Sequence, residues 1–252
     1  MIHLERKNEV MVVTLENGKV NVLDTTFLQE IEQCFKDLSR DECKSVVITG
    51  AGNSFCAGVD LKKTFTNGDE ALSEFMDALS CCFKTLFEFN KPLIGAINGH
   101  ALAGGCIISS ACDYKVLAAG RAKIGITELA VGLSFPMTPL EIMRFVIPQN
   151  KLQEVFYFAK GYNAEDAKKL GLIDEIVSAE QLQETAFNYA VKLGSIPNET
   201  FKKTKLQLRA PFINAYSSKE SFDFDLIVKK QWSSEETKKV VGSFIESLKK
   251  SL

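Results

Sequence analysis

The chain has little of what nucleic-acid binding or metal binding requires. Its 252 residues include only two histidines, and 30 lysine and arginine residues are balanced by 32 aspartate and glutamate residues. A near-neutral chain with no basic cluster lacks the electrostatic footprint of a nucleic-acid-binding protein. The adjacent pair Cys81 and Cys82 lacks the spacing of a zinc site, and His3 and His100 add few further ligands. We therefore expect neither a nucleic-acid partner nor a bound metal.

Long apolar runs and targeting signals are also missing. Polar residues or glycine interrupt every apolar stretch well before it reaches the thickness of a bilayer, so we expect no membrane span. No secretory leader is recognisable, and the final Ser251 and Leu252 lack the peroxisomal tripeptide. The seven cysteines are then expected to be free, buried thiols. The expected location is the cytoplasm.

What is present is an alternation of strand-like and helical patterns, followed by a helical region. Amphipathic helical patterns occupy residues 25–38 and 69–89. Such alternation predicts an α/β core with a mainly parallel sheet. From residue 136 the pattern is helical, with one short strand at 173–177, and a helix is predicted at 199–208. The strand-like runs in the first half are 1–6, 10–15, 45–50, 93–97, 112–118 and 122–125.

Two glycine-rich segments follow two of these strands. Residues 54–61 read SFCAGVDL, and residues 96–106 read AINGHALAGGC. Ligands of α/β proteins gather beyond the carboxyl ends of parallel strands, and two exposed backbone NH groups brought together there would form an oxyanion hole. Taken singly, each turn is better explained by a tight turn and close helix packing. Neither segment matches a phosphate-binding loop or a complete dinucleotide fingerprint.

Together and in this order, the two segments resemble the paired signatures of the crotonase (enoyl-CoA hydratase/isomerase) superfamily. The resemblance extends through VNVL at 20–23, ACDY at 111–114, IGITE at 124–128 and AEDAKKLGLID at 164–174. It implies an α/β fold with a ββα spiral core over residues 1–195 and a helical trimerisation region over residues 196–252. It also implies an acyl-CoA substrate, no separate cofactor, and a homotrimer or a dimer of trimers.

The resemblance also assigns the candidate catalytic groups. The backbone NH groups of Val59 and Gly104 would hold the thioester oxygen, and Glu128 matches the acid/base glutamate of the family's Gly-x-x-Glu segment. Hydratases carry another glutamate three residues after the oxyanion glycine, where this chain has Ile107, an aliphatic residue that cannot activate water. A single carboxylate suits a proton shuttle, so the chain looks most like the mitochondrial-type Δ3,Δ2-enoyl-CoA isomerases. These move the double bond of 3-enoyl-CoA to give trans-2-enoyl-CoA in fatty-acid β-oxidation.

The apolar neighbours expected around Glu128 should raise the pKa of its carboxylate toward neutrality. Two other functions stay open. One is another acyl-CoA activity on the same fold, such as weak hydration or acyl-CoA hydrolysis, although Ile107 does not supply the second polar group that it would require. The other is a non-catalytic acyl-CoA-binding scaffold, against which the presence of Glu128 argues.

The remaining binding residues are assigned by analogy with the family. Lys62 is a candidate for contacting the nucleotide, and Lys249 or Lys250 of a neighbouring subunit for contacting a phosphate. Phe65, Phe75, Met76 and Phe135 are candidates for lining an acyl tunnel. The other candidate substrate or CoA contacts are Ala57, Gly58, Asp60, Ala103 and Ile107.

Overall fold

The computed structural model describes residues 1–250, with side chains described through Ser247. Its main sheet has six strands in the order β1-β2-β3-β5-β7-β9. Strand β1 runs antiparallel to β2, and every other neighbouring pair is parallel, as the alternating pattern predicts. The strands are β1 (Ile2–Lys7), β2 (Val10–Leu15), β3 (Ser45–Gly50), β5 (Leu93–Ile97), β7 (Tyr114–Ala118) and β9 (Glu175–Val177).

A second, three-stranded parallel sheet lies next to the first. It consists of β4 (Ser54–Cys56), β6 (His100–Leu102) and β8 (Ile124–Gly125). The strand predicted at 122–125 therefore belongs to this sheet, and β4 and β6 arise inside the segments read as glycine turns. Strands of two or three residues are too short for an alternating pattern to reveal them. Strands β3, β5 and β7 are each followed by a short strand and then a helix, which is the repeat of a ββα spiral.

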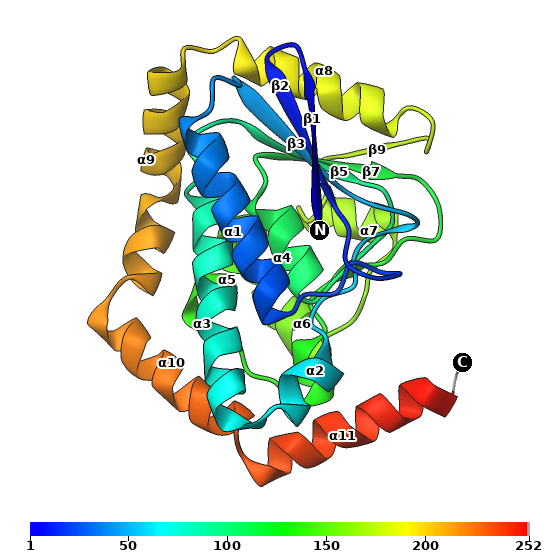
Figure 1. Cartoon of the computed structure of the whole chain (residues 1–252), viewed down its shortest axis with the longest axis vertical. Helices are drawn as coiled ribbons and strands as arrows, with labels where there is room; N and C mark the ends of the chain where they lie inside the picture. The colour runs from blue at the N-terminus through cyan, green and yellow to red at the C-terminus, as the bar shows by residue number, and fades with distance from the viewer. Residues whose placement is uncertain (251–252) are drawn as a thin grey trace.

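Helices cover both faces of the main sheet (Figure 1). On one face lie α1 (Thr25–Arg40), α3 (Gly68–Phe87) and α4 (Gly104–Ala111), and on the other lies α8 (Leu182–Gly194). Helix α1 begins at a side-chain cap, where Asp24 accepts a hydrogen bond of 2.8 Å from the NH of Phe27. Helix α8 packs small residues such as Ala186 and Ala190 against the sheet. The sheet is thus buried on both sides, as parallel sheets require.

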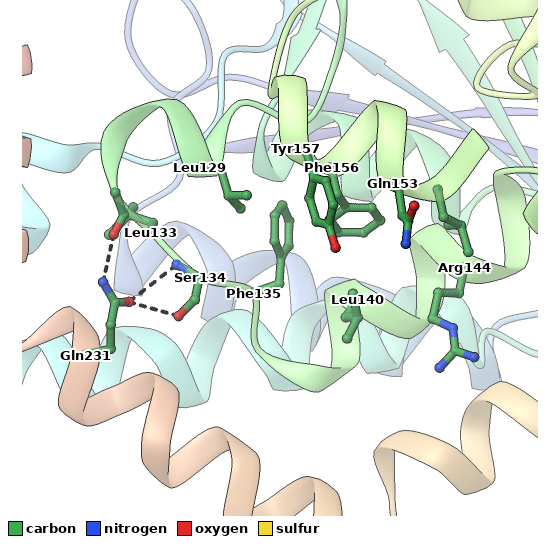
Figure 2. Close-up of a pocket in the computed structure, with 12 residues that line it drawn as sticks. Leu129, Leu133, Ser134, Phe135, Leu140, Arg144, Gln153, Phe156, Tyr157 and Gln231 are labelled. Atoms are coloured by element: carbon green, nitrogen blue, oxygen red, sulfur yellow. Dashed lines mark hydrogen bonds between the residues drawn. The ribbon is translucent and has the colours of Figure 1, made fainter. Parts of the chain in front are cut away.

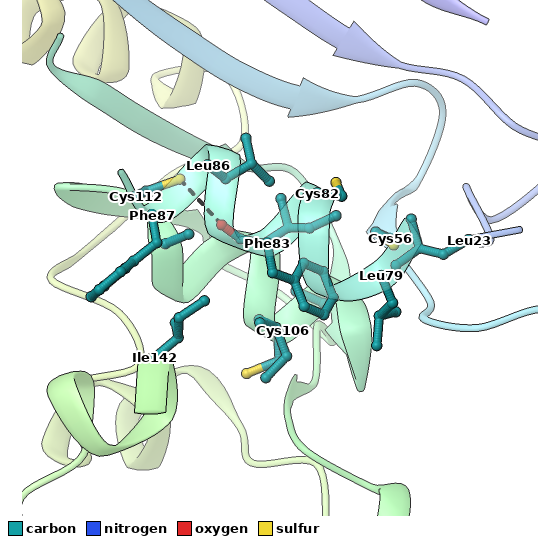
Figure 3. Close-up of a cluster of buried hydrophobic side chains, with 14 of the residues drawn as sticks. Leu23, Cys56, Leu79, Cys82, Phe83, Leu86, Phe87, Cys106, Cys112 and Ile142 are labelled. Atoms are coloured by element: carbon teal, nitrogen blue, oxygen red, sulfur yellow. Dashed lines mark hydrogen bonds between the residues drawn. The ribbon is translucent and has the colours of Figure 1, made fainter. Parts of the chain in front are cut away.

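The larger core surrounds α3, and cysteines contribute to it as small apolar side chains (Figure 3). Cys56, Cys82, Cys106 and Cys112 are buried there as free thiols. Cys34 is free and only partly buried, so the expectation of buried thiols was wrong for this residue, and it was also wrong for Cys81, which is free and exposed. Its neighbour Cys82 occupies the buried face of α3, and consecutive helix positions point in different directions.

The second half of the chain is mainly helical, as predicted. Among residues 1–250, no helix is long and apolar enough to cross a membrane. The elements are α2 (Leu61–Thr66), η1 (Glu128–Val131), α5 (Met137–Val146), η2 (Gln149–Lys151), α6 (Leu152–Phe158), α7 (Ala164–Lys169), α9 (Asn198–Tyr216), α10 (Lys219–Trp232) and α11 (Glu235–Lys250).

Helices α9, α10 and α11 run around the outside of the core (Figure 1). Helix α9 is anchored by Lys205 and Arg209, whose buried cationic groups each lie 2.8 Å from a carboxylate oxygen of Asp113. The sequence pattern predicted a helix only as far as residue 208, and Pro211, three residues further on, has no NH to donate a helix hydrogen bond. The helix instead continues through Pro211 to Tyr216, a residue that is buried against the core. The last of the three helices, α11, packs against α2 and η1.

Candidate active site

The two glycine segments of the sequence lie against each other in the fold. A Cβ atom on Gly58 would lie 2.7 Å from the Cβ of Ala103 and 3.4 Å from the nitrogen of Gly104. Gly58 also has φ +92°, a conformation that residues with a side chain rarely adopt. The backbone of one turn therefore touches the backbone of the other because Gly58 has no side chain.

Within the described residues, this arrangement leaves two backbone NH groups without a hydrogen-bond partner. A bridge between Leu23 and Val59 holds the first turn, with Leu23 NH donating to Gly58 O at 2.8 Å and Asp60 NH donating to Leu23 O at 2.9 Å. Neither of these two hydrogen bonds uses the NH of Val59. Gly104 opens α4, so its NH is a first-turn amide without an intrahelical partner and lies at the positive end of the helix dipole. Both NH groups suit a negatively charged oxygen.

Backbone strain is also present next to Gly104. Ala103, which immediately precedes Gly104, has φ 49° and ψ −125°, although it is not glycine. Its NH donates to Gly125 O at 2.9 Å, and its carbonyl accepts from the NH groups of Cys106 and Ile107. Such conformations cost on the order of 1–3 kcal/mol and persist at sites where the surrounding structure enforces them.

Glu128 lies in a small apolar cavity beside these turns, here called the Glu128 cavity. Its volume is about 20 Å³, and Ile107, only 1% exposed, forms part of its wall. Among the described residues lining it, Glu128 is the only one with a titratable side chain. The lining consists of Val59, Leu79, Phe83, Gly104, Ile107, Glu128, Phe135, Pro136, Pro139 and Trp232.

Burial raises the pKa of the Glu128 carboxyl group to about 7. The residue as a whole is partly accessible, but its carboxyl group is enclosed by protein atoms, which disfavours the charged form. A hydrogen bond of 2.8 Å from the NH of Thr127 opposes this effect in part. The raised pKa expected from the apolar neighbours is confirmed, and it makes Glu128 able both to accept and to return a proton near neutral pH.

The other predicted contacts divide into those near the Glu128 cavity and those away from it. Phe135 lines the cavity, whereas Phe65, Phe75 and Met76 do not. Asp60 caps α2, accepting the NH of Lys63 at 2.9 Å, which gives it a structural role independent of any ligand.

Three further predictions concern the part of the molecule assigned to CoA. The NH of Ala57 donates to Val20 O at 3.0 Å, which fixes the first turn from its other side. Lys62 is exposed on α2. Lys249 and Lys250 lie outside the residues whose side chains the structure describes.

Sequence reasoning missed the residue that closes the Glu128 cavity from the far end of the chain. Trp232, the last residue of α10, is 1% exposed, and its indole NH donates to Ser134 O at 2.9 Å. Its ring stacks with Phe65 at a centroid distance of 6.0 Å. Only its being the single tryptophan of the chain sets it apart in the sequence, because it lies far from both glycine segments along the chain.

The spiral fold, the paired turn amides and the buried carboxylate define a crotonase-type protein. The chain belongs to the enoyl-CoA hydratase/isomerase family, whose model matches residues 5–251. A short-chain-enoyl-CoA hydratase of Clostridium acetobutylicum is 27% identical over 98% of this chain and 95% of its own length. The human mitochondrial enoyl-CoA delta isomerase 1 is 28% identical over 79% of this chain and 67% of its own length.

Structural similarity extends over nearly the whole chain. The crystal structure of the human mitochondrial delta3-delta2-enoyl-CoA isomerase superposes with a TM-score of 0.93, covering 99% of this chain and 98% of that one at 25% identity. The family is thereby established. Relatives named as hydratases and relatives named as isomerases match at similar identity, so the choice between the two reactions depends on the residues of the site.

Proposed function

We propose that this protein is a Δ3,Δ2-enoyl-CoA isomerase, converting 3-enoyl-CoA to trans-2-enoyl-CoA in fatty-acid β-oxidation. The observation that carries the proposal is the pairing of Glu128 with Ile107. Glu128 is the only titratable side chain among the described residues of its cavity, and an aliphatic side chain occupies the position of the hydratases' other glutamate. Concerted addition of water requires a second proton-transfer group, whereas moving a double bond requires one.

The reaction follows from the placement of the groups. The Glu128 carboxylate removes a proton from the α carbon of the bound thioester, and the electron pair of that C–H bond delocalises onto the thioester oxygen. The NH groups of Val59 and Gly104 stabilise this oxygen, whose charge develops in a site lined by apolar side chains. Glu128 then returns the same proton to the γ carbon, which leaves the double bond one position closer to the thioester. No group beyond the chain and the CoA thioester is called for, so we propose no cofactor.

The assembly is proposed from the surface of the C-terminal helices. Helix α10 exposes Phe222 and Phe224 at 65% and 58%, together with Leu226 and Ile227. Four large exposed apolar side chains on one helix are a feature of protein–protein contact surfaces. It supports the homotrimer, or dimer of trimers, implied by the family resemblance. The division at residues 195 and 196 and the cytoplasmic location stay predictions from the sequence.

The proposal is tested by offering both reactions to the purified protein. With 3-hexenoyl-CoA we expect double-bond migration, and with crotonyl-CoA little or no addition of water, each followed by chromatography of the thioesters. Hydration faster than migration would refute the assignment, and tight thioester binding without turnover would favour a scaffold. As a matched variant, Ile107→Glu places a second carboxylate in the Glu128 cavity and should raise the hydration-to-isomerisation ratio about tenfold or more.

The pH dependence of the rate is expected to follow the ionisation of Glu128. The carboxylate must be charged to accept a proton, so kcat/KM should be low where Glu128 is protonated and level off above its pKa of about 7. Below about pH 7 we expect kcat/KM to fall about tenfold for each pH unit. A profile measured with 3-hexenoyl-CoA between pH 5 and about 9 checks this. A flat profile across the acid range would contradict the role of this carboxylate.

A further inference from the structure

A second and much larger cavity adjoins the Glu128 cavity, and we call it the outer pocket (Figure 2). Its volume is about 670 Å³, which is in the range of small-molecule sites. It lies between η1, α5, α6 and the end of α10. Its lining residues are Leu129, Gly132, Leu133, Ser134, Phe135, Leu140, Arg144, Leu152, Gln153, Phe156, Tyr157 and Gln231.

The outer pocket is lined mainly by apolar side chains, and two of its polar side chains already have hydrogen-bond partners. Arg144 donates to Glu141 at 2.6 Å. Gln231 donates to Gly132 O at 2.8 Å and accepts from the hydroxyl of Ser134 at 2.8 Å, as the dashed lines in Figure 2 show. The pocket therefore suits a hydrocarbon chain better than a charged ligand.

One residue, Phe135, lines both cavities. Figure 2 shows its ring between Leu129 and Phe156, and it meets the Phe156 ring edge-on at a centroid distance of 4.8 Å. The backbone on its N-terminal side is held, since Ser134 O accepts from the indole of Trp232. The ring of Phe135 thus separates the Glu128 cavity from the outer pocket.

We infer that Phe135 sets the acyl-chain length that the enzyme accepts. This inference rests on the proposed function. The Glu128 cavity of about 20 Å³ has room for only about one water-sized group, so any acyl chain that reaches Glu128 must displace part of its lining, and a longer chain meets the ring of Phe135. The wild-type substrate class is then short-chain 3-enoyl-CoA. Once the ring is removed, the outer pocket receives the distal part of a longer chain, and each buried methylene contributes about fourfold to affinity.

The test compares 3-hexenoyl-CoA with 3-dodecenoyl-CoA. The quantity measured is the ratio of kcat/KM for the twelve-carbon substrate to kcat/KM for the six-carbon substrate. We expect this ratio to be below one in the wild type and to rise about tenfold or more in Phe135→Ala, because several methylenes enter the outer pocket. Phe135→Leu, a milder change that keeps an apolar side chain, should raise the ratio by a smaller factor.

Two further variants decide where the longer chain lies. Leu152→Trp in the Phe135→Ala background fills the outer pocket from a residue that does not line the Glu128 cavity, and it should return the ratio toward the wild-type value. Phe158→Ala removes a phenyl ring that is 70% exposed and lines neither cavity, and it should leave both rates unchanged. Thermal unfolding of every variant shows that the fold is retained.

The outcomes separate this inference from the proposed function. Suppose that the wild type isomerises 3-hexenoyl-CoA and that Phe135→Ala and Phe135→Leu have the same ratio of kcat/KM values as the wild type. The role of Phe135 is then overturned, and the isomerase assignment stays intact. A wild type that isomerises both lengths equally well overturns it too. If the wild type only hydrates, the isomerase assignment fails, and the same ratio measured with 2-enoyl-CoA thioesters still tests Phe135.

Discussion

Replacing Glu128 with glutamine is expected to abolish isomerisation, lowering kcat by about a thousandfold or more. General acid–base catalysis by one side chain contributes about 10²–10⁴-fold, and here the same carboxylate both removes and returns the proton. Among the described residues, no other titratable side chain lines the cavity, so none can take over. The amide of glutamine keeps the shape and retains an oxygen for the NH of Thr127. The measurement is the initial rate with 3-hexenoyl-CoA.

A carboxylate outside the site provides the matched control. Glu165 is exposed on α7, and Glu165→Gln should leave the rate unchanged. If Glu128→Gln isomerised 3-hexenoyl-CoA at the wild-type rate, another group would have to carry the proton.

The pH dependence of the stability of Glu128→Gln tests independently whether burial disfavours the charged form of Glu128. The folded-state pKa is raised from 4.5 to about 7, so the stabilising contribution of the protonated group is present below about pH 4.5 and is lost as the pH rises through 7. Glutamine cannot ionise and avoids this loss. The variant should therefore unfold at a higher temperature than the wild type at pH 8, and the difference should shrink toward pH 5. The same measurement shows that the variant is folded, so its loss of activity is not caused by unfolding.

Gly58→Ala is expected to lower kcat by about 10²–10³-fold, the effect of losing one oxyanion-hole donor. The added Cβ would lie 2.7 Å from the Cβ of Ala103 and 2.9 Å from Leu102 O, and φ +92° is unfavourable for alanine. The peptide between Gly58 and Val59 must then shift, which moves the Val59 NH away from the thioester oxygen. Because the oxygen becomes charged only during reaction, the loss should fall mainly on kcat rather than on KM.

The control separates the oxyanion hole from backbone strain. Gly18 also has positive φ, at 66°, but a Cβ there would have no atom within 4 Å. Gly18→Ala should therefore cost a little stability and leave kcat unchanged. If the two variants lost activity equally, the Gly58 turn would not be part of the site.

Local patterns predicted the strands and helices well where burial is regular. The run 45–50 is buried throughout as β3, and α1 buries its apolar face as its periodicity predicts. Short elements without periodicity escaped prediction, including α2 and the three-residue strands β4 and β6. The end of α9 was predicted too early: the helix continues through Pro211 to Tyr216, where packing on the core outweighs the local penalty of the proline.

The sequence by itself determined the family, the two turns that carry the NH groups, and Glu128 with Ile107, because these features depend on residue type and spacing within short segments. Only the tertiary structure decided that Gly58 touches Ala103, that the Glu128 carboxyl group is enclosed, and that Trp232 closes its cavity. It also placed Phe135 between two cavities of very different size. Burial, close approach and cavity shape depend on residues that are distant along the chain and meet only when the turns of the spiral stack and the C-terminal helices pack around them.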